Sequence, residues 1–95
     1  MDQASVAALH RLLIVANRDT GQSKRVADFL LSWWNAATCG KWDPTDLGAL
    51  DYEISEDILV LLRSVDATRS YPDTLGYKAE FDRLVRDWRP HLLKE

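Results

Sequence analysis

Acidic side chains gather in one stretch of this sequence. From Trp42 to Leu62 the chain contains no Lys or Arg, and we call this stretch the acidic segment. Its carboxylates are Asp43, Asp46, Asp51, Glu53, Glu56 and Asp57. Unbalanced negative charge of this kind attracts a basic surface on another molecule. The segment, with the aromatic Trp42 at its edge, therefore predicts a binding site for a partner protein with a basic surface.

Helix capping is the alternative explanation for the same acids. Asp43 and Asp46 flank Pro44 in a sequence typical of a helix start, and Glu56 and Asp57 follow Ser55 in another. Acidic residues at these positions cap free amides and oppose the helix dipole. Asp51 and Glu53 have no such role in the predicted helices. These two acids are therefore the ones that most favour docking.

The sequence offers little for catalysis or metal binding. Its acids lack the alternating spacing and the turn glycine of a calcium loop. His10, Cys39 and His91 stand apart, without the paired spacing of a zinc site. Residues 18–25 are basic and contain a glycine, but they lack the full phosphate-loop pattern. We expect no metal, no cofactor and no enzymatic activity, and a Cys39–His10 nucleophilic pair assembled by the fold stays open as an alternative.

The last predicted helix carries a second kind of surface. Its basic residues lie away from the apolar stripe, and they are Lys78, Arg83, Arg86 and Arg89. Such a face suits a nucleic-acid-binding or regulatory protein. Acidic residues interleave with it, however, and the isoelectric point near 5.3 is low for a nucleic-acid-binding domain. Nucleic-acid binding is therefore the alternative function.

Helical periodicity dominates the elements that must position these residues. We expect a first helix over residues 3–16 and a second, the centre of the fold, from Gln22 or Ser23 to Cys39, with Gly21 at positive φ and Gly40 after its end. A short helical turn is expected over 47–50, a further helix from Ser55, and a last helix that ends before Pro90. No stretch alternates with the period of a strand. The prediction is an all-α, compact single domain over residues 1–95, with four main helices and one short helix.

Four tryptophans are a large share for a chain of 95 residues. Trp33 follows the apolar stripe of the second helix and is expected in the core. Trp34 points about 100° away from it, so it packs against a second helix or is partly exposed. Trp42 stands at the edge of the acidic segment, where an exposed indole would make a strong contact for a partner.

Composition limits the class of protein further. The chain is 46% apolar, which is ordinary for a folded domain, and it has one cysteine, so no disulfide can form within it. No apolar run approaches the ~20 residues that cross a bilayer, and the first residues lack the basic start of a signal peptide. We expect a cytoplasmic protein that does not enter membranes. Self-association remains open.

Three stretches resemble a known family. They are Asp19–Ala36 (DTGQSKRVADFLLSWWNA), Tyr71–Tyr77 (YPDTLGY) and Trp88-Arg89-Pro90. Together they resemble an uncharacterised family of small proteins carried on proteobacterial integrative and conjugative elements. The resemblance covers most of the chain and implies a genomic setting rather than an activity.

The leading hypothesis joins the acidic segment to that setting. Small acidic proteins of mobile elements often block host defences by occupying a basic groove, as some anti-CRISPR proteins do. We therefore predict a non-enzymatic protein-interaction module whose partner is a basic protein, in its most concrete form a nucleic-acid-processing defence complex that it inhibits. The binding residues would be those of the acidic segment together with Trp42.

Overall fold

The computed structural model describes residues 1–93, and all regular elements in that range are helical. Four main helices carry the fold: α1 (Gln3–Ala16), α2 (Gly21–Trp34), α4 (Tyr52–Thr68) and α5 (Lys78–Trp88). The short elements are α3 (Ala36–Cys39) and the 3₁₀ helices η1 (Pro44–Ala49), η2 (Pro72–Leu75) and η3 (Pro90–Leu93). The predicted all-α class with four main helices is confirmed, although the chain has several short helices rather than one.

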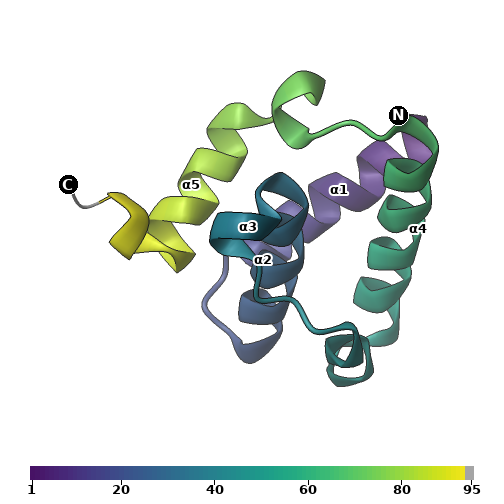
Figure 1. Cartoon of the computed structure of the whole chain (residues 1–95). Coiled ribbons are helices and arrows are strands. Elements are labelled where there is room, and N and C mark those ends of the chain that lie inside the picture. The colour runs from purple at the N-terminus through teal and green to yellow at the C-terminus, as the bar shows by residue number, and fades with distance from the viewer. Residues whose placement is uncertain (94–95) are drawn as a thin grey trace.

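The main helices pack around a single core. α1 contacts both α2 and α4, and α2 also contacts α5. Figure 1 shows α4 and α5 on opposite sides of the molecule, with α1 and α2 between them. The largest fully buried apolar side chains are Leu9, Leu12, Leu30, Leu31, Ile58, Leu61, Phe81 and Leu84. Each contributes roughly 1.5–3 kcal/mol by leaving water, so this core supplies most of the stability.

Side-chain caps fix the first two helices. The Ser5 amide donates to Asp2 Oδ1 at 2.8 Å, and α1 has the predicted bounds. The Ser23 amide donates to Thr20 Oγ1 at 3.0 Å, which starts α2 at Gly21. Gly21 is therefore a helical residue, and the prediction of positive φ there is wrong. Gly76, which follows η2, is the glycine with positive φ in residues 1–93, at 90°.

α2 ends earlier than its periodicity predicts. Asn35 leaves the helical region at φ −156° and ψ 86°, and its side chain accepts from the Thr38 amide at 3.2 Å to cap α3. An asparagine competes for backbone hydrogen bonds in this way, so one predicted helix becomes two. The chain then turns tightly at Gly40, where a Cβ atom would lie 2.3 Å from the Ala36 carbonyl oxygen. Only glycine fits this position.

α4 begins earlier than predicted, at Tyr52 rather than at Ser55. The Ile54 and Ser55 amides donate to the Asp51 carbonyl oxygen at 3.0 Å, which makes Asp51 the N-cap residue. Asp51 and Glu53 thus stand at a helix start, whereas Glu56 and Asp57 lie in the next turn. The prediction that Glu56 and Asp57 stand at the start of this helix is therefore wrong, and Asp51 and Glu53 stand there instead.

Three indole N–H groups hold distant segments together. Trp33 Nε1 donates to the Ser70 carbonyl at 2.9 Å, and Trp88 Nε1 donates to the Ala16 carbonyl at 2.9 Å. Trp34, which is half-buried, donates to Asp73 Oδ1 at 3.0 Å. Buried indoles commonly find such partners, and here they attach the loop around η2 and the end of α5 to the body of the domain.

Candidate interaction surface

The acidic segment begins with a closed capping box. Asp43 Oδ1 accepts from the Thr45 amide at 2.9 Å, while Asp46 Oδ2 accepts from the Asp43 amide at 3.5 Å. The hydrogen bond from the Thr45 backbone lowers the pKa of Asp43. The helix start predicted at Asp43-Pro44 is confirmed. The carboxylates of Asp43 and Asp46 both accept hydrogen bonds from backbone amides at this start.

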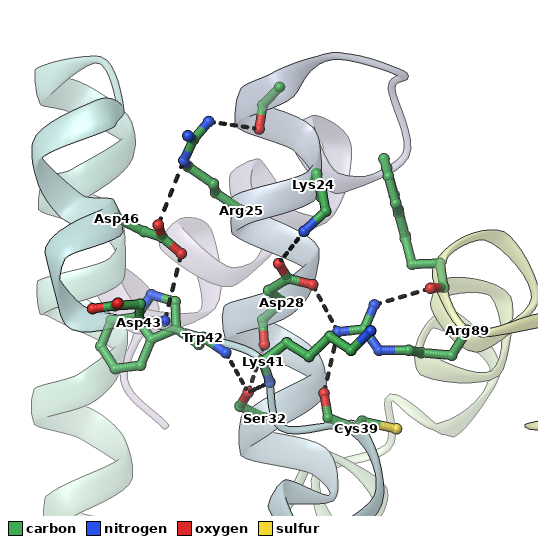
Figure 2. A network of polar contacts seen from close by, with 12 residues as sticks. Lys24, Arg25, Asp28, Ser32, Cys39, Lys41, Trp42, Asp43, Asp46 and Arg89 are labelled. Carbon is green, nitrogen blue, oxygen red and sulfur yellow. Dashed lines mark hydrogen bonds and ion pairs between the residues drawn. The ribbon is translucent and has the colours of Figure 1, made fainter.

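Cations from other helices reach two acids of the segment. Arg25 of α2 lies 3.5 Å from Asp46, and Figure 2 shows the two side chains pointing toward each other. Arg11 of α1 donates to both oxygens of Asp57, at 2.9 and 2.8 Å, and this hydrogen bonding raises the pKa of Arg11. Because these cations come from sequence-distant positions, the acidic segment is less negative in space than along the chain.

Four carboxylates of the acidic segment remain without a cation partner among residues 1–93: Asp43, which caps η1, and three in the first two turns of α4. Asp51 and Glu53 are exposed, and neither side chain accepts a hydrogen bond in the described part of the chain. Glu56 is also exposed and accepts from the Tyr52 hydroxyl at 3.3 Å. We call Asp51, Glu53 and Glu56 the acidic end of α4. It is the part of the predicted surface that stays available to a partner.

Trp42 does not form the exposed aromatic contact that its position predicts. Its ring packs edge-on against Phe29, with centroids 5.1 Å apart and planes at 66°. Its backbone amide donates to Ser32 Oγ at 3.3 Å, so the chain is held against α2 (Figure 2). The indole is half-buried between α2 and α4, beside a hollow of about 210 Å³ that Leu62 also lines. Its Nε1 is buried without a partner in residues 1–93.

Tyr52 takes the exposed position instead. It is 73% exposed at the first turn of α4, beside Glu53 and Glu56. Leu59 and Val60 of the same helix are also exposed, at 45% and 38%. The signal for this face was present in the sequence, since residues 52, 56, 59, 60 and 63 share one side of a helix once its start is placed at Tyr52.

The basic face of α5 is smaller than predicted. Lys78 pairs with Asp82 at 2.8 Å, and Arg83 lies 3.8 Å from Asp87. Arg86 is exposed without an ion pair in the described residues. A nucleic acid would meet alternating charges here, which weakens attraction to phosphates.

Arg89 does not lie on that face at all. It is only 3% exposed, and its Nη2 donates to Asp28 Oδ1 at 2.7 Å and to the Cys39 carbonyl at 3.1 Å. Lys24 binds the other Asp28 oxygen at 2.9 Å, which completes the cluster in Figure 2. We call Lys24, Asp28 and Arg89 the buried ion cluster. It joins the end of α5 to α2 and α3.

The groups considered for catalysis lie in different surroundings. His10 is exposed and its Nε2 lies 3.1 Å from the Tyr77 hydroxyl. Cys39 is 1% exposed, and burial raises the pKa of its thiol, which opposes the thiolate that a nucleophile needs. No hydrogen bond joins the two side chains in residues 1–93.

Residues 1–93 contain neither a cluster of metal ligands nor a helix that could span a membrane. No three His, Cys, Asp or Glu side chains are grouped so that they could hold a metal ion. No helix in this range has the length and apolar character needed to cross a membrane.

Comparison with known proteins identifies a family. A family model, described as a family of unknown function (DUF7673), matches residues 6–89. No curated protein and no solved structure matches the chain.

Proposed function

The chain belongs to this family of unknown function (DUF7673), and we propose that it is a non-enzymatic interaction module that binds a basic partner protein through the acidic end of α4. One observation carries the proposal: Asp51, Glu53 and Glu56 keep exposed carboxylates without cations among residues 1–93, whereas Asp46 and Asp57 are paired. Charges that no internal cation neutralises are the ones free to attract a basic partner.

Electrostatic docking at this site has a recognisable physical signature. Exposed charges attract an oppositely charged surface over about 10 Å at 0.1 M salt, and higher salt screens them. Complementary charge therefore speeds association and selects the partner more than it adds affinity. Neutralising Asp51 and Glu53 should slow association and flatten its dependence on salt.

The most specific form of the proposal names the class of partner. The resemblance of Asp19–Ala36 and Tyr71–Tyr77 to proteins of proteobacterial conjugative elements supports a protein made inside a bacterial host. A nucleic-acid-processing defence complex offers the basic groove that the acidic end of α4 would fit. In this form the protein acts in the cytoplasm as an inhibitor of that complex.

The test combines partner capture with matched variants. Tagged wild-type protein is incubated with a proteobacterial lysate, washed at about 50 mM and about 500 mM salt, and read by mass spectrometry. The double variant Asp51→Asn/Glu53→Gln is run in parallel with Asp82→Asn/Asp87→Asn, which removes the same charge from α5. The expected partner is retained at low salt by the wild type and by the α5 variant, and is lost from the α4 variant.

The opposite results have clear meanings. Equal capture by the α4 variant at low salt would contradict docking through Asp51 and Glu53. Nucleic acid that co-purifies without a protein, and is released by charge removal at Arg86, would transfer the function to α5.

A further inference from the structure

The outward side of α4 has a palindromic spacing. Its members along the helix are Tyr52, Glu56, Leu59, Val60, Arg63 and Ala67. The intervals between them run four, three, one, three and four residues, symmetric about the midpoint between Leu59 and Val60. These positions share one face of the helix, and all of them are exposed, whereas Ile58 and Leu61 on the opposite face are fully buried.

A second copy of the helix, running antiparallel, would meet this face in register. Leu59 would lie against Val60 of the partner subunit, Glu56 against Arg63 of the partner subunit, and Tyr52 against Ala67 of the partner subunit. Each pair occurs twice because the arrangement has a twofold axis. The contacts would extend over about 22 Å, from 1.5 Å of helix rise per residue.

The chemistry of each pair is complementary. Leu59 and Val60, exposed at 45% and 38%, supply an apolar centre. Neither Glu56 nor Arg63 has an ion-pair partner among residues 1–93, so each is available to the other across the axis. Such a face would bury apolar surface and satisfy its own charges only when two copies meet.

A groove on the surface of α4 could accommodate the side chain of Tyr52 of the partner subunit. A groove of about 510 Å³ lies between the start of α1 and α4, and its lining includes Ala4, Ser64 and Ala67. The small Ala67 leaves room where the pairing would place the ring of Tyr52, which is 73% exposed in the single chain. The exposed ring of Tyr52 and the groove beside Ala67 thus lie at positions that the same twofold axis relates.

From this self-complementarity we infer that the chain forms a twofold-symmetric, antiparallel homodimer through the outward faces of its α4 helices. The inference goes beyond the proposed function and does not depend on it. Asp51 precedes the helix and Glu53 flanks the stripe, so both stay outside the dimer contact. Glu56 would face Arg63 of the partner subunit, so the dimer would carry two copies of Asp51 and Glu53 alone, and a bivalent partner could engage both.

Charge swapping tests the register directly. The full chain is studied by sedimentation equilibrium between about 5 and about 500 µM, a range that covers weak dimers. The wild type should dimerise within it. Glu56→Arg places two arginines together at both charged contacts, and Arg63→Glu places two glutamates together there, so each variant alone should raise the dimer dissociation constant at least about tenfold. An equimolar mixture of the two variants should restore dimers, because one chain then carries arginine at positions 56 and 63 and the other carries glutamate, so both charged contacts of the mixed pair join an arginine and a glutamate.

Matched controls separate this geometry from general effects of charge and folding. Glu80→Arg makes the same charge change on α5, away from the stripe, and should leave dimerisation near the wild-type level. Circular dichroism of each variant reports whether the helices remain intact. A wild type that stays monomeric over the whole range would overturn the dimer. Single variants that dimerise normally, or a mixture that stays monomeric, would overturn the Glu56–Arg63 register.

Discussion

The buried ion cluster and the acidic end of α4 both hold carboxylates, but the fold treats them in opposite ways. Asp28 is 2% exposed and is bound by Lys24 and Arg89, at 2.9 and 2.7 Å. Asp51 is exposed and has no cation partner in residues 1–93. The difference separates charge that is paired within the domain from charge that stays exposed to solvent.

Physical cost explains why both oxygens of the buried Asp28 carboxylate are paired with cations. A carboxylate without partners in the interior would lose several kcal/mol of hydration that nothing replaces. Arg89 offsets this with a planar group that binds Asp28 and the Cys39 carbonyl together, and its Nη1 also donates to the Trp88 carbonyl at 2.9 Å. The end of α5 is therefore fixed to α2 by polar contacts as well as by packing.

The largest expected effect comes from breaking this cluster. Arg89→Met keeps an unbranched apolar stem but removes the guanidinium group, which leaves Asp28 with Lys24 alone. Removing one partner of a buried pair typically costs about 3–5 kcal/mol, and because Lys24 remains we expect a value near the lower end. Urea unfolding followed by circular dichroism measures the free energy. Arg86→Met is the matched control on the exposed side of α5, and a loss from Arg89→Met no larger than from this control would refute the structural role.

Cys39 provides a second way to follow the same region. Its thiol is buried, and burial raises its pKa, so a thiol reagent should react slowly with the folded protein. Because Arg89 binds the Cys39 carbonyl, the Arg89→Met variant should open this region and react faster. The rate of labelling at neutral pH checks this, with fully unfolded protein as the reference. Equal labelling rates for Cys39 in the wild type and the variant would mean that the buried ion cluster does not keep the end of α3 closed to the reagent.

Local sequence was sufficient for the fold class and for several helix ends. The bounds of α1 and the capping box at Asp43 depend on residues within one turn, and both were predictable. The break at Asn35 was missed because apolar spacing continues through it, and a capping side chain decides the ending instead. The start of α4 was misplaced because Ser55 resembles a cap, whereas its hydroxyl donates to the Tyr52 carbonyl at 3.3 Å.

The candidate site was less predictable, since its charges are paired across the fold. Asp28 and Arg89 are 61 residues apart, and Arg11 and Asp57 are 46 apart, so no local window contains either pair. One indication was present: Asp28 lies in a helix that is apolar on more than one side, and a buried carboxylate requires a cation. The net charge of the acidic segment, counted along the sequence, is therefore more negative than the surface that the segment forms in the fold.

Asp57 tests the boundary between the two regions. It belongs to the acidic segment, yet Arg11 binds both of its oxygens and links α1 to α4. Asp57→Asn should lower the free energy of unfolding by about 0.5–1 kcal/mol, because Arg11 is 60% exposed and water screens the pair. Urea unfolding at two salt concentrations measures the change, which should shrink at high salt. A double-mutant cycle with Arg11→Ala isolates the pair, and a coupling energy of zero would place Asp57 with the freely exposed acids.

A smaller effect is expected from acid titration of Asp43. The folded-state pKa of Asp43 lies below its ordinary value of 3.8, chiefly because the Thr45 amide donates to the carboxylate. The unfolded chain therefore binds this proton first as the pH falls, and stability that is present above about pH 4 is lost as the pH drops through the folded-state pKa. Asp43→Asn should flatten this part of the acid limb of a urea-midpoint profile. Identical profiles for the wild type and Asp43→Asn would contradict the cap.

The smallest effect on stability should come from the charges with the largest proposed role. Asp51→Asn/Glu53→Gln removes two exposed carboxylates from the start of α4. The favourable interaction with the helix dipole is lost while mutual repulsion is relieved, so the free energy of unfolding should change by no more than about 0.5 kcal/mol. Capture of a basic partner should nevertheless fall, and this separation of stability from binding is what the contrast with Arg89 requires. A loss of stability comparable to that of Arg89→Met would mean that these acids also serve the fold, and the distinction between the two regions would fail.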